Sequence, residues 1–251
     1  MGINEKTGTV FSVAAENAPL AGCTVSKAVA DASGAYVSHF SLAAGTDISP
    51  ETYQRHKLWF VADGELEALI LHRAKSVKSA TFIPDEKLGE LCELGARQSE
   101  DGCAESPILQ TGDLFVTPIG VPVGVRSERG GVYTEIEIGK DTTMNKMLET
   151  GKAFALKDVL PYAEGRIVNM DLASGPDMKF VLMSFDAGTG LSEHAAPGDA
   201  LVFALDGEAT IGYEDAEHVI KAGENFKFAK NGRHWVKANG RFKMALLLVV
   251  D

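Results

Sequence analysis

A repeat at a fixed separation constrains this chain of 251 residues more than any other feature of its sequence. Three segment pairs share the offset of 143 residues that separates positions 6 and 149: KTGTVFSV and ETGKAFAL (6–13, 149–156), LAAGTDISPE and FDAGTGLSEH (42–51, 185–194), FVADGELEALI and FALDGEATIGY (60–70, 203–213). Self-similarity at one offset is the signature of duplicated structural units. We therefore expect the chain to fold as two related domains.

A fourth pair shows that the first unit is longer than the second. TGDLFVTPIGVPV (111–123) and AGENFKFAKNGRH (222–234) are separated by 111 residues, so the first unit carries 32 extra residues, the difference between 143 and 111. We assign them to an insertion over 72–108, which contains the short amphipathic stretch DEKLGELCELGARQ. The insertion is either a lid or a surface excursion, and the tolerance of folds for long loops favours the excursion.

Outside the insertion the pattern is that of short strands. Apolar runs such as KLWFVA, KFVLMSF and MALLLVV are separated by Gly, Pro and Asp turns, and helix signals are nearly absent. We predict an all-β fold of two tandem jelly-roll barrels, over 1–142 and 143–251. The last strand is apolar on both faces, so we expect the sister domain or the second subunit of a homodimer to cover the face outside the barrel.

Composition narrows the classes of partner. The net charge of -11 argues against nucleic acid and anionic membranes, which both require a basic face. Cys23, Cys92 and Cys103 fit neither a disulfide framework nor a zinc knuckle. The sequence shows no leader pattern and no apolar run of about 18 residues, so a cytoplasmic protein that binds a small molecule is expected.

Two stretches of the second unit resemble the motifs of the cupin superfamily. GTGLSEHAAPGDALVFALDG (188–207) is similar to the first motif, G(X)5HXH(X)3,4E(X)6G, and GENFKFAKNGRHWVKAN (223–239) to the second, G(X)5PXG(X)2H(X)3N. The resemblance implies a bicupin, a chain of two small jelly-roll barrels. In that family two histidines and a glutamate of the first motif and a histidine of the second hold a divalent metal inside the barrel.

The second unit keeps half of the metal ligands that the resemblance implies. The four places fall on His194, Ala196, Ala200 and His234. Side chains alternate along a strand, so Glu193 points away from His194 and is a poor replacement ligand. Two imidazoles without a carboxylate form a weak site unless water or a bound acid completes the shell.

The first unit departs further from the motif. Its four ligand places hold Glu51, Tyr53, Lys57 and Val123, so no metal shell remains there. One hypothesis is an internal ion pair between Glu51 and Lys57, with Tyr53 as a hydrogen-bond partner, in the place of the cation. The alternative is a wet barrel mouth in which both charged side chains reach water.

Two classes of function follow. The first is a protein that binds a small polar or anionic molecule, with His194 and His234 in the C-terminal barrel and Glu51, Tyr53 and Lys57 as further candidate ligand-binding residues. The second is a metal-dependent enzyme of dioxygenase, isomerase or decarboxylase type, in which the two histidines hold Zn, Fe, Mn, Ni or Cu. Signatures of nucleotide-binding loops and of nucleophile-elbow hydrolases are missing from the sequence.

Overall fold

The computed structural model describes residues 2–32, 35–71 and 106–250, and it confirms the all-β prediction. The two helices within these ranges are one turn long, α1 (Val13–Glu16) and α3 (Leu156–Val159). No helix in these ranges is long and apolar enough to cross a membrane. Residues 72–105 of the predicted insertion, including Cys92 and Cys103, lie outside the described residues.

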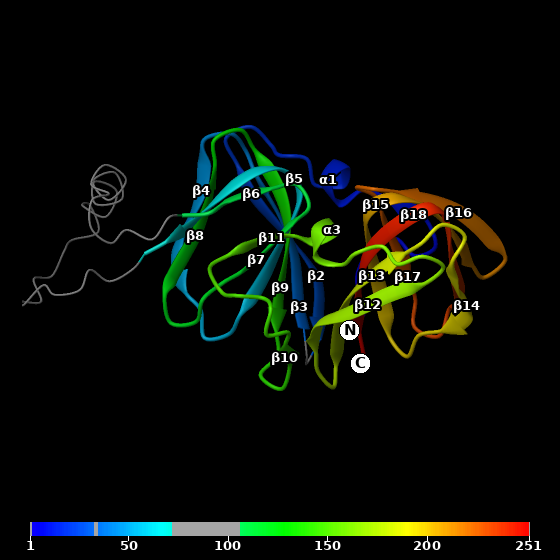
Figure 1. Ribbon diagram of the computed structural model, residues 1–251. Helices are drawn as coiled ribbons and strands as arrows, with labels where there is room; N and C mark the ends of the chain where they lie inside the picture. Colours follow the sequence, from blue (N-terminus) through cyan, green and yellow to red (C-terminus); the bar gives the residue numbers. More distant parts are fainter. Residues whose placement is uncertain (1, 33–34, 72–105, 251) are drawn as a thin grey trace, which may run out of the picture.

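Two barrels lie side by side, one from each repeat (Figure 1). The strands of the first repeat are β1 (Val10–Phe11), β2 (Thr24–Ala32), β3 (Ala35–Leu42), β4 (Thr46–Thr52), β5 (Lys57–Ile70), β6 (Ile108–Gln110), β7 (Asp113–Val116), β8 (Pro122–Ser127) and β9 (Gly131–Ile138). Those of the second are β10 (Thr143–Met144), β11 (Ala153–Ala155), β12 (Ile167–Ser174), β13 (Met178–Phe185), β14 (Gly190–Ala195), β15 (Asp199–Tyr213), β16 (Ala216–Lys221), β17 (Asn225–Phe228) and β18 (Arg233–Val249). Ile108, which the sequence analysis placed in the insertion, begins β6.

The two repeats exchange short strands. β1 leaves the first repeat and pairs with β17 of the C-terminal barrel, where Val10 lies opposite Phe226. β11 makes the reverse crossing and pairs with β7 of the N-terminal barrel, where Phe154 lies opposite Leu114. Each sheet of nine strands is therefore completed by a strand from the other repeat.

Glycines at equivalent positions allow two long strands, β5 and β15, to bend around each barrel. Gly64 in β5 and Gly207 in β15 have φ angles of 83° and 73°, in the left-handed region that favours glycine. A Cβ atom would lie 2.3 Å from Gly130 O at the first position and 1.9 Å from Arg241 O at the second. The glycines shared by the repeats are thus required by the same close approach of neighbouring backbone in both barrels.

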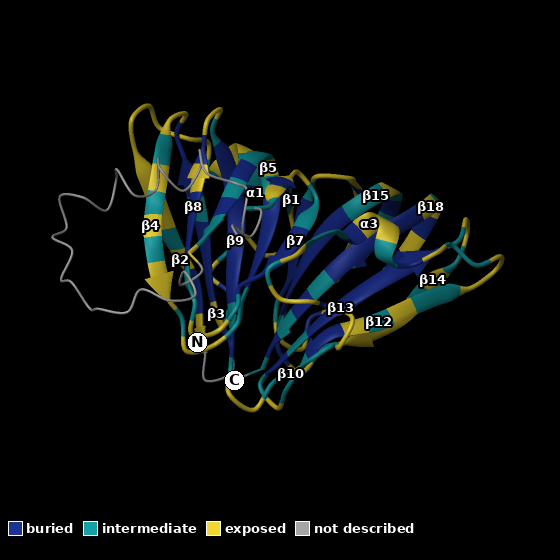
Figure 2. Ribbon diagram, turned by 60° about the vertical axis from the view of Figure 1, so that its left-hand side comes forward, coloured by how far each residue is buried: buried dark blue, intermediate teal, exposed yellow. Residues whose placement is uncertain are grey.

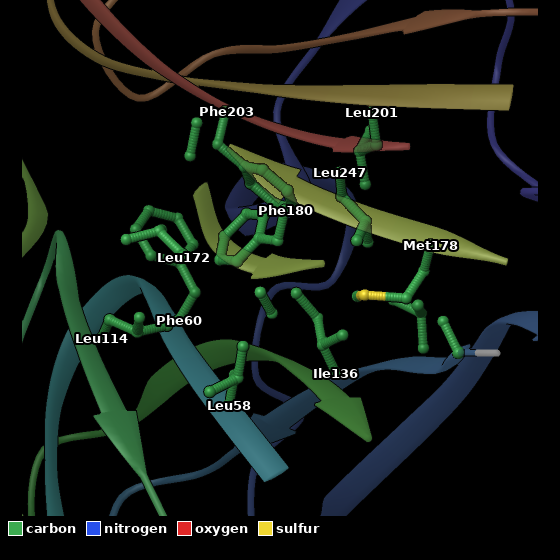
Figure 3. Close-up of a cluster of buried hydrophobic side chains, with 14 of the residues drawn as sticks. Leu58, Phe60, Leu114, Ile136, Leu172, Met178, Phe180, Leu201, Phe203 and Leu247 are labelled. Carbon is green, nitrogen blue, oxygen red and sulfur yellow. The ribbon is translucent and has the colours of Figure 1, made fainter. Parts of the chain in front are cut away.

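The buried apolar residues form three clusters, one inside each barrel and one between them. Figure 2 shows that buried residues lie along the strands of both barrels. In the cluster between the barrels, the Phe60 and Phe203 ring centroids lie 5.1 Å apart and their planes are inclined at 65°. Figure 3 shows Leu58 and Ile136 of the first repeat facing this cluster. The barrels are therefore held together by a continuous apolar core.

The last strand, β18, uses its two apolar faces as predicted. Phe242 and Met244 belong to the cluster inside the C-terminal barrel, whereas Ala245, Leu247 and Val249 belong to the cluster between the barrels. The sister domain therefore covers the outer face of this strand.

Candidate functional site

The structure brings His194 and His234 together at one end of the C-terminal barrel. His194 on β14 lies directly opposite His234 on β18 in the antiparallel register, and the ring centroids are 4.3 Å apart. Asn231, just before β18, has a φ of 62°, so the turn that precedes His234 uses the left-handed conformation expected there. We call these two residues the histidine pair.

Main-chain carbonyls fix the tautomer of both rings. His194 Nδ1 lies 2.8 Å from Ser192 O, and His234 Nδ1 lies 2.9 Å from Gly232 O. Because a carbonyl oxygen can only accept, each Nδ1 carries its proton and donates it. In the neutral rings both Nε2 atoms therefore keep a lone pair that can accept a hydrogen bond or bind a metal.

The two histidines differ in their surroundings. His234 is 4% exposed and stacks on Phe228, with 3.9 Å between ring centroids, whereas His194 is exposed. Burial lowers the pKa of the His234 imidazole, His194 lowers it further, and the bond to the Gly232 carbonyl offsets only part of this. His234 is therefore held in its neutral form.

The metal site that the family resemblance implies fits this barrel only in part. Two imidazole nitrogens are available, but the methyl side chains of Ala196 and Ala200 cannot bind a metal. In the described ranges, no group of three or more His, Cys, Asp or Glu side chains is placed to hold a metal ion. His194 and His234 would supply two ligands, and water or a bound small molecule would have to supply the others.

The N-terminal barrel contains a buried ion pair, but the partner predicted for its lysine was wrong. Lys57 Nζ lies 2.7 Å from Glu135 Oε1, with 17% and 6% of the two side chains exposed. Glu51 is an exposed residue on β4. Glu135 replaces it because β9 runs beside β5 with Glu135 opposite Trp59, so the Glu135 carboxylate lies deeper in the barrel.

Aromatic residues surround this ion pair. Trp59 Nε1 donates to Glu135 Oε2 at 2.8 Å, so each carboxylate oxygen has a partner. Tyr53 contributes its ring face, with Lys57 Nζ 4.3 Å from the ring centroid. Burial and the nearby carboxylates of Glu135 and Glu51 raise the pKa of the Tyr53 phenol. Lys57, which stands at one of the four positions that the resemblance assigns to metal ligands, is therefore paired with Glu135 and covered by the Tyr53 ring.

The comparisons with known proteins agree with this architecture. Residues 181–250 match the model of the Cupin domain family, and no curated protein sequence matches the chain. A "Cupin 2 conserved barrel domain protein" from Leptotrichia buccalis is 23% identical, with a TM-score of 0.76 over 99% of this chain and 100% of its own.

Two larger proteins share the fold at lower identity. A salicylate 1,2-dioxygenase from Pseudaminobacter salicylatoxidans is 10% identical, with a TM-score of 0.54 over 89% of this chain and 76% of its own. An oxalate decarboxylase from Bacillus subtilis is 11% identical, with a TM-score of 0.51 over 100% and 79%. The chain is therefore a protein of two tandem barrels with the fold of the cupin superfamily, and its residues 181–250 match the Cupin domain family.

Proposed function

We propose that the histidine pair binds a small polar molecule at the mouth of the C-terminal barrel. The observation that carries this proposal is the anchoring of both Nδ1–H groups by main-chain carbonyls, which leaves two Nε2 atoms side by side. Neutral imidazoles accept hydrogen bonds from hydroxyl or amide groups, and protonated ones donate to a carboxylate. Because burial favours neutral His234, the accepting form dominates near neutral pH.

Salicylamide is a suitable probe, because its hydroxyl and amide groups can donate hydrogen bonds to neutral imidazoles and it is the uncharged amide of salicylate, which is named for one protein of similar fold. Calorimetric titration should give one site per chain. His194→Gln and His234→Gln should each weaken binding about three- to tenfold, as expected for losing one hydrogen bond between uncharged groups. His218→Gln is the matched control, because the His218 ring packs on Phe226 instead. This variant should bind as the parent does. Equal binding by all four proteins would refute the role of the pair.

A second candidate function is metal-dependent catalysis, and one observation favours it. Histidines that bind metals commonly donate their other ring N–H to a carbonyl or carboxylate, as both rings do here. A bound divalent metal would polarise an oxygen atom of the substrate, and the two histidines would hold the metal in position.

Elemental analysis of untagged protein purified without chelator separates the two candidates. Near-stoichiometric metal that is lost in His194→Ala and His234→Ala would establish the metal centre. Protein that contains no metal and takes up no added Fe, Mn, Ni, Cu or Zn would exclude it and leave the direct binding of a small molecule.

A further inference from the structure

A cavity of about 310 Å³ opens between the two barrels, away from the histidine pair. Its walls come from both repeats at equivalent places: Phe60, Val61 and Ala62 of β5, and Phe203, Ala204 and Leu205 of β15. These triplets are related by the same offset of 143 residues as the sequence repeat, measured between positions 60 and 203. The cavity therefore lies where the two copies of one segment converge.

The cavity opens to solvent at the edge of the close-packed cluster between the barrels. Protein interiors contain few voids larger than a water molecule, and the surrounding cluster is packed, with Phe60 6% and Phe203 1% exposed. Small-molecule sites typically have volumes of roughly 300–1,000 Å³, apolar and aromatic walls, and positions at domain interfaces. The cavity meets each of these conditions.

The main-chain groups of the wall are already paired with one another. Gly112 N donates to Val61 O and Gly223 N donates to Ala204 O, each at 2.9 Å, in equivalent turns of the two repeats. Asn225 is also fully engaged, because its Oδ1 accepts from Val13 N and its Nδ2 donates to Val202 O. The wall thus offers few polar atoms to ordered water and favours an apolar occupant.

The charges around the cavity favour a ligand without net charge. Its lining includes one cationic residue, Lys157, and one anionic residue, Glu224, together with the hydroxyl-bearing Thr111. Glu224 Oε2 accepts from Lys221 N at 2.7 Å, so part of that carboxylate is engaged. Because a cation and a carboxylate both lie around this small cavity, neither an anionic nor a cationic ligand has a clear electrostatic advantage.

We propose that this inter-barrel cavity binds a small uncharged apolar molecule, which lies against Ala62, Leu205 and Ala222 and whose polar edge faces the solvent. Phe60 and Phe203 pack against each other behind this wall and support it. The site is separate from the histidine pair and does not depend on the function proposed for it.

The test uses 5-fluoroindole as the probe and ¹⁹F NMR of the full-length protein. We expect saturable binding of one probe per chain, unchanged in the His194→Ala/His234→Ala double variant. Ala222→Trp and Thr111→Trp fill the cavity from exposed positions on its two sides, so each should weaken binding at least about tenfold. Ala216→Trp, at an exposed position that does not line the cavity, is the matched control and should bind as the parent does.

Two results would overturn the proposal. The first is the absence of binding up to the solubility limit of the probe, and the second is binding that survives in both filled variants. Intermolecular NOEs from the probe to the side chains of Ala62 and Leu205 provide a measurement that needs no variant. If those NOEs are absent while the probe is bound, the probe occupies a different site and the assignment to this cavity is wrong.

Discussion

Lys57 and Glu135 show how one pair of charged residues is accommodated inside a barrel. Their charges are buried together, and the carboxylate is completed by Trp59 Nε1. A buried charge is tolerated only when it is paired and hydrogen-bonded. Lys57 and Trp59 together therefore compensate the buried Glu135 carboxylate.

Lys57→Met should lower the free energy of unfolding by about 3–5 kcal/mol, because it leaves the Glu135 carboxylate buried without its cation. The double variant Lys57→Met/Glu135→Leu should lose less than the single one, since it removes both charges. Lys152→Met is the control, because Lys152 pairs with Glu149 on the surface and such pairs contribute less than about 1 kcal/mol. Chemical denaturation measures all three, and a loss below about 1 kcal/mol for Lys57→Met would contradict the buried-pair interpretation.

The sequence predicted that Lys57 points inward but could not identify Glu135 as its partner. In β9, Val132, Ile136 and Ile138 alternate with Tyr133 and Glu135. Alternation separates two faces without saying which one is inside the barrel, and here the aliphatic face packs between the barrels. The histidine pair was easier to predict, because the motif spacing alone places His194 and His234 on neighbouring strands.

At the scale of elements, the N-terminal strap, residues 2–13, connects the barrels. Ile3 N donates to Asp199 Oδ2 of the C-terminal barrel at 2.8 Å, and Asn4 N donates to Val29 O of the N-terminal barrel at 2.6 Å. Glu5, whose side chain is 3% exposed, lies 2.5 Å from Lys27 Nζ and 3.4 Å from His39 Nε2. One short segment thus makes polar contacts with both domains.

Glu5 should make the strap sensitive to acid. Burial raises the pKa of its carboxyl, but contacts with His39 and Lys27 outweigh burial and hold the pKa below the ordinary value of 4.5. A lowered folded-state pKa contributes stability above 4.5 that is lost as the pH falls through the lowered value. Unfolding of Glu5→Gln should therefore depend less on pH in this acidic range than unfolding of the parent.

Thermal unfolding at a series of acidic pH values measures this difference. Glu16→Gln is the matched control in the neighbouring helix α1, because the Lys6–Glu16 pair is more exposed. The same acid dependence in the parent and in Glu5→Gln would show that the carboxylate does not stabilise the strap.

The strand exchange could not be predicted from the local sequence pattern. β1 and β11 are two and three residues long, too short for any period to be read from them. Their partners, β17 and β7, are determined by how the barrels face each other, which depends on tertiary packing. The repeat predicted two related domains, but it contained no information on which domain each short strand would join.

At the scale of the whole molecule, the cluster between the barrels should make them unfold together. Phe180 has no exposed surface and packs beside Phe203, with 6.4 Å between ring centroids (Figure 3). Phe180→Ala should lower stability by about 3–5 kcal/mol. Val219→Ala, at a position that is 50% exposed, should change stability by less than about 0.5 kcal/mol.

Differential scanning calorimetry distinguishes joint from separate unfolding. We expect one transition in the parent and one transition at lower temperature in Phe180→Ala, because this cluster and the exchanged strands couple the domains. Two separate transitions, one of them unchanged in the variant, would mean that the N-terminal barrel is stable without its neighbour.

The position of both barrels in one chain also determines how the protein behaves on dilution. A pair of separate barrels joined by the same contacts would come apart at low concentration, because association depends on encounter. Here both barrels belong to one chain, so their effective local concentration does not change with that of the protein. The interface between the barrels, together with the cavity that opens beside it, persists even when the protein is scarce.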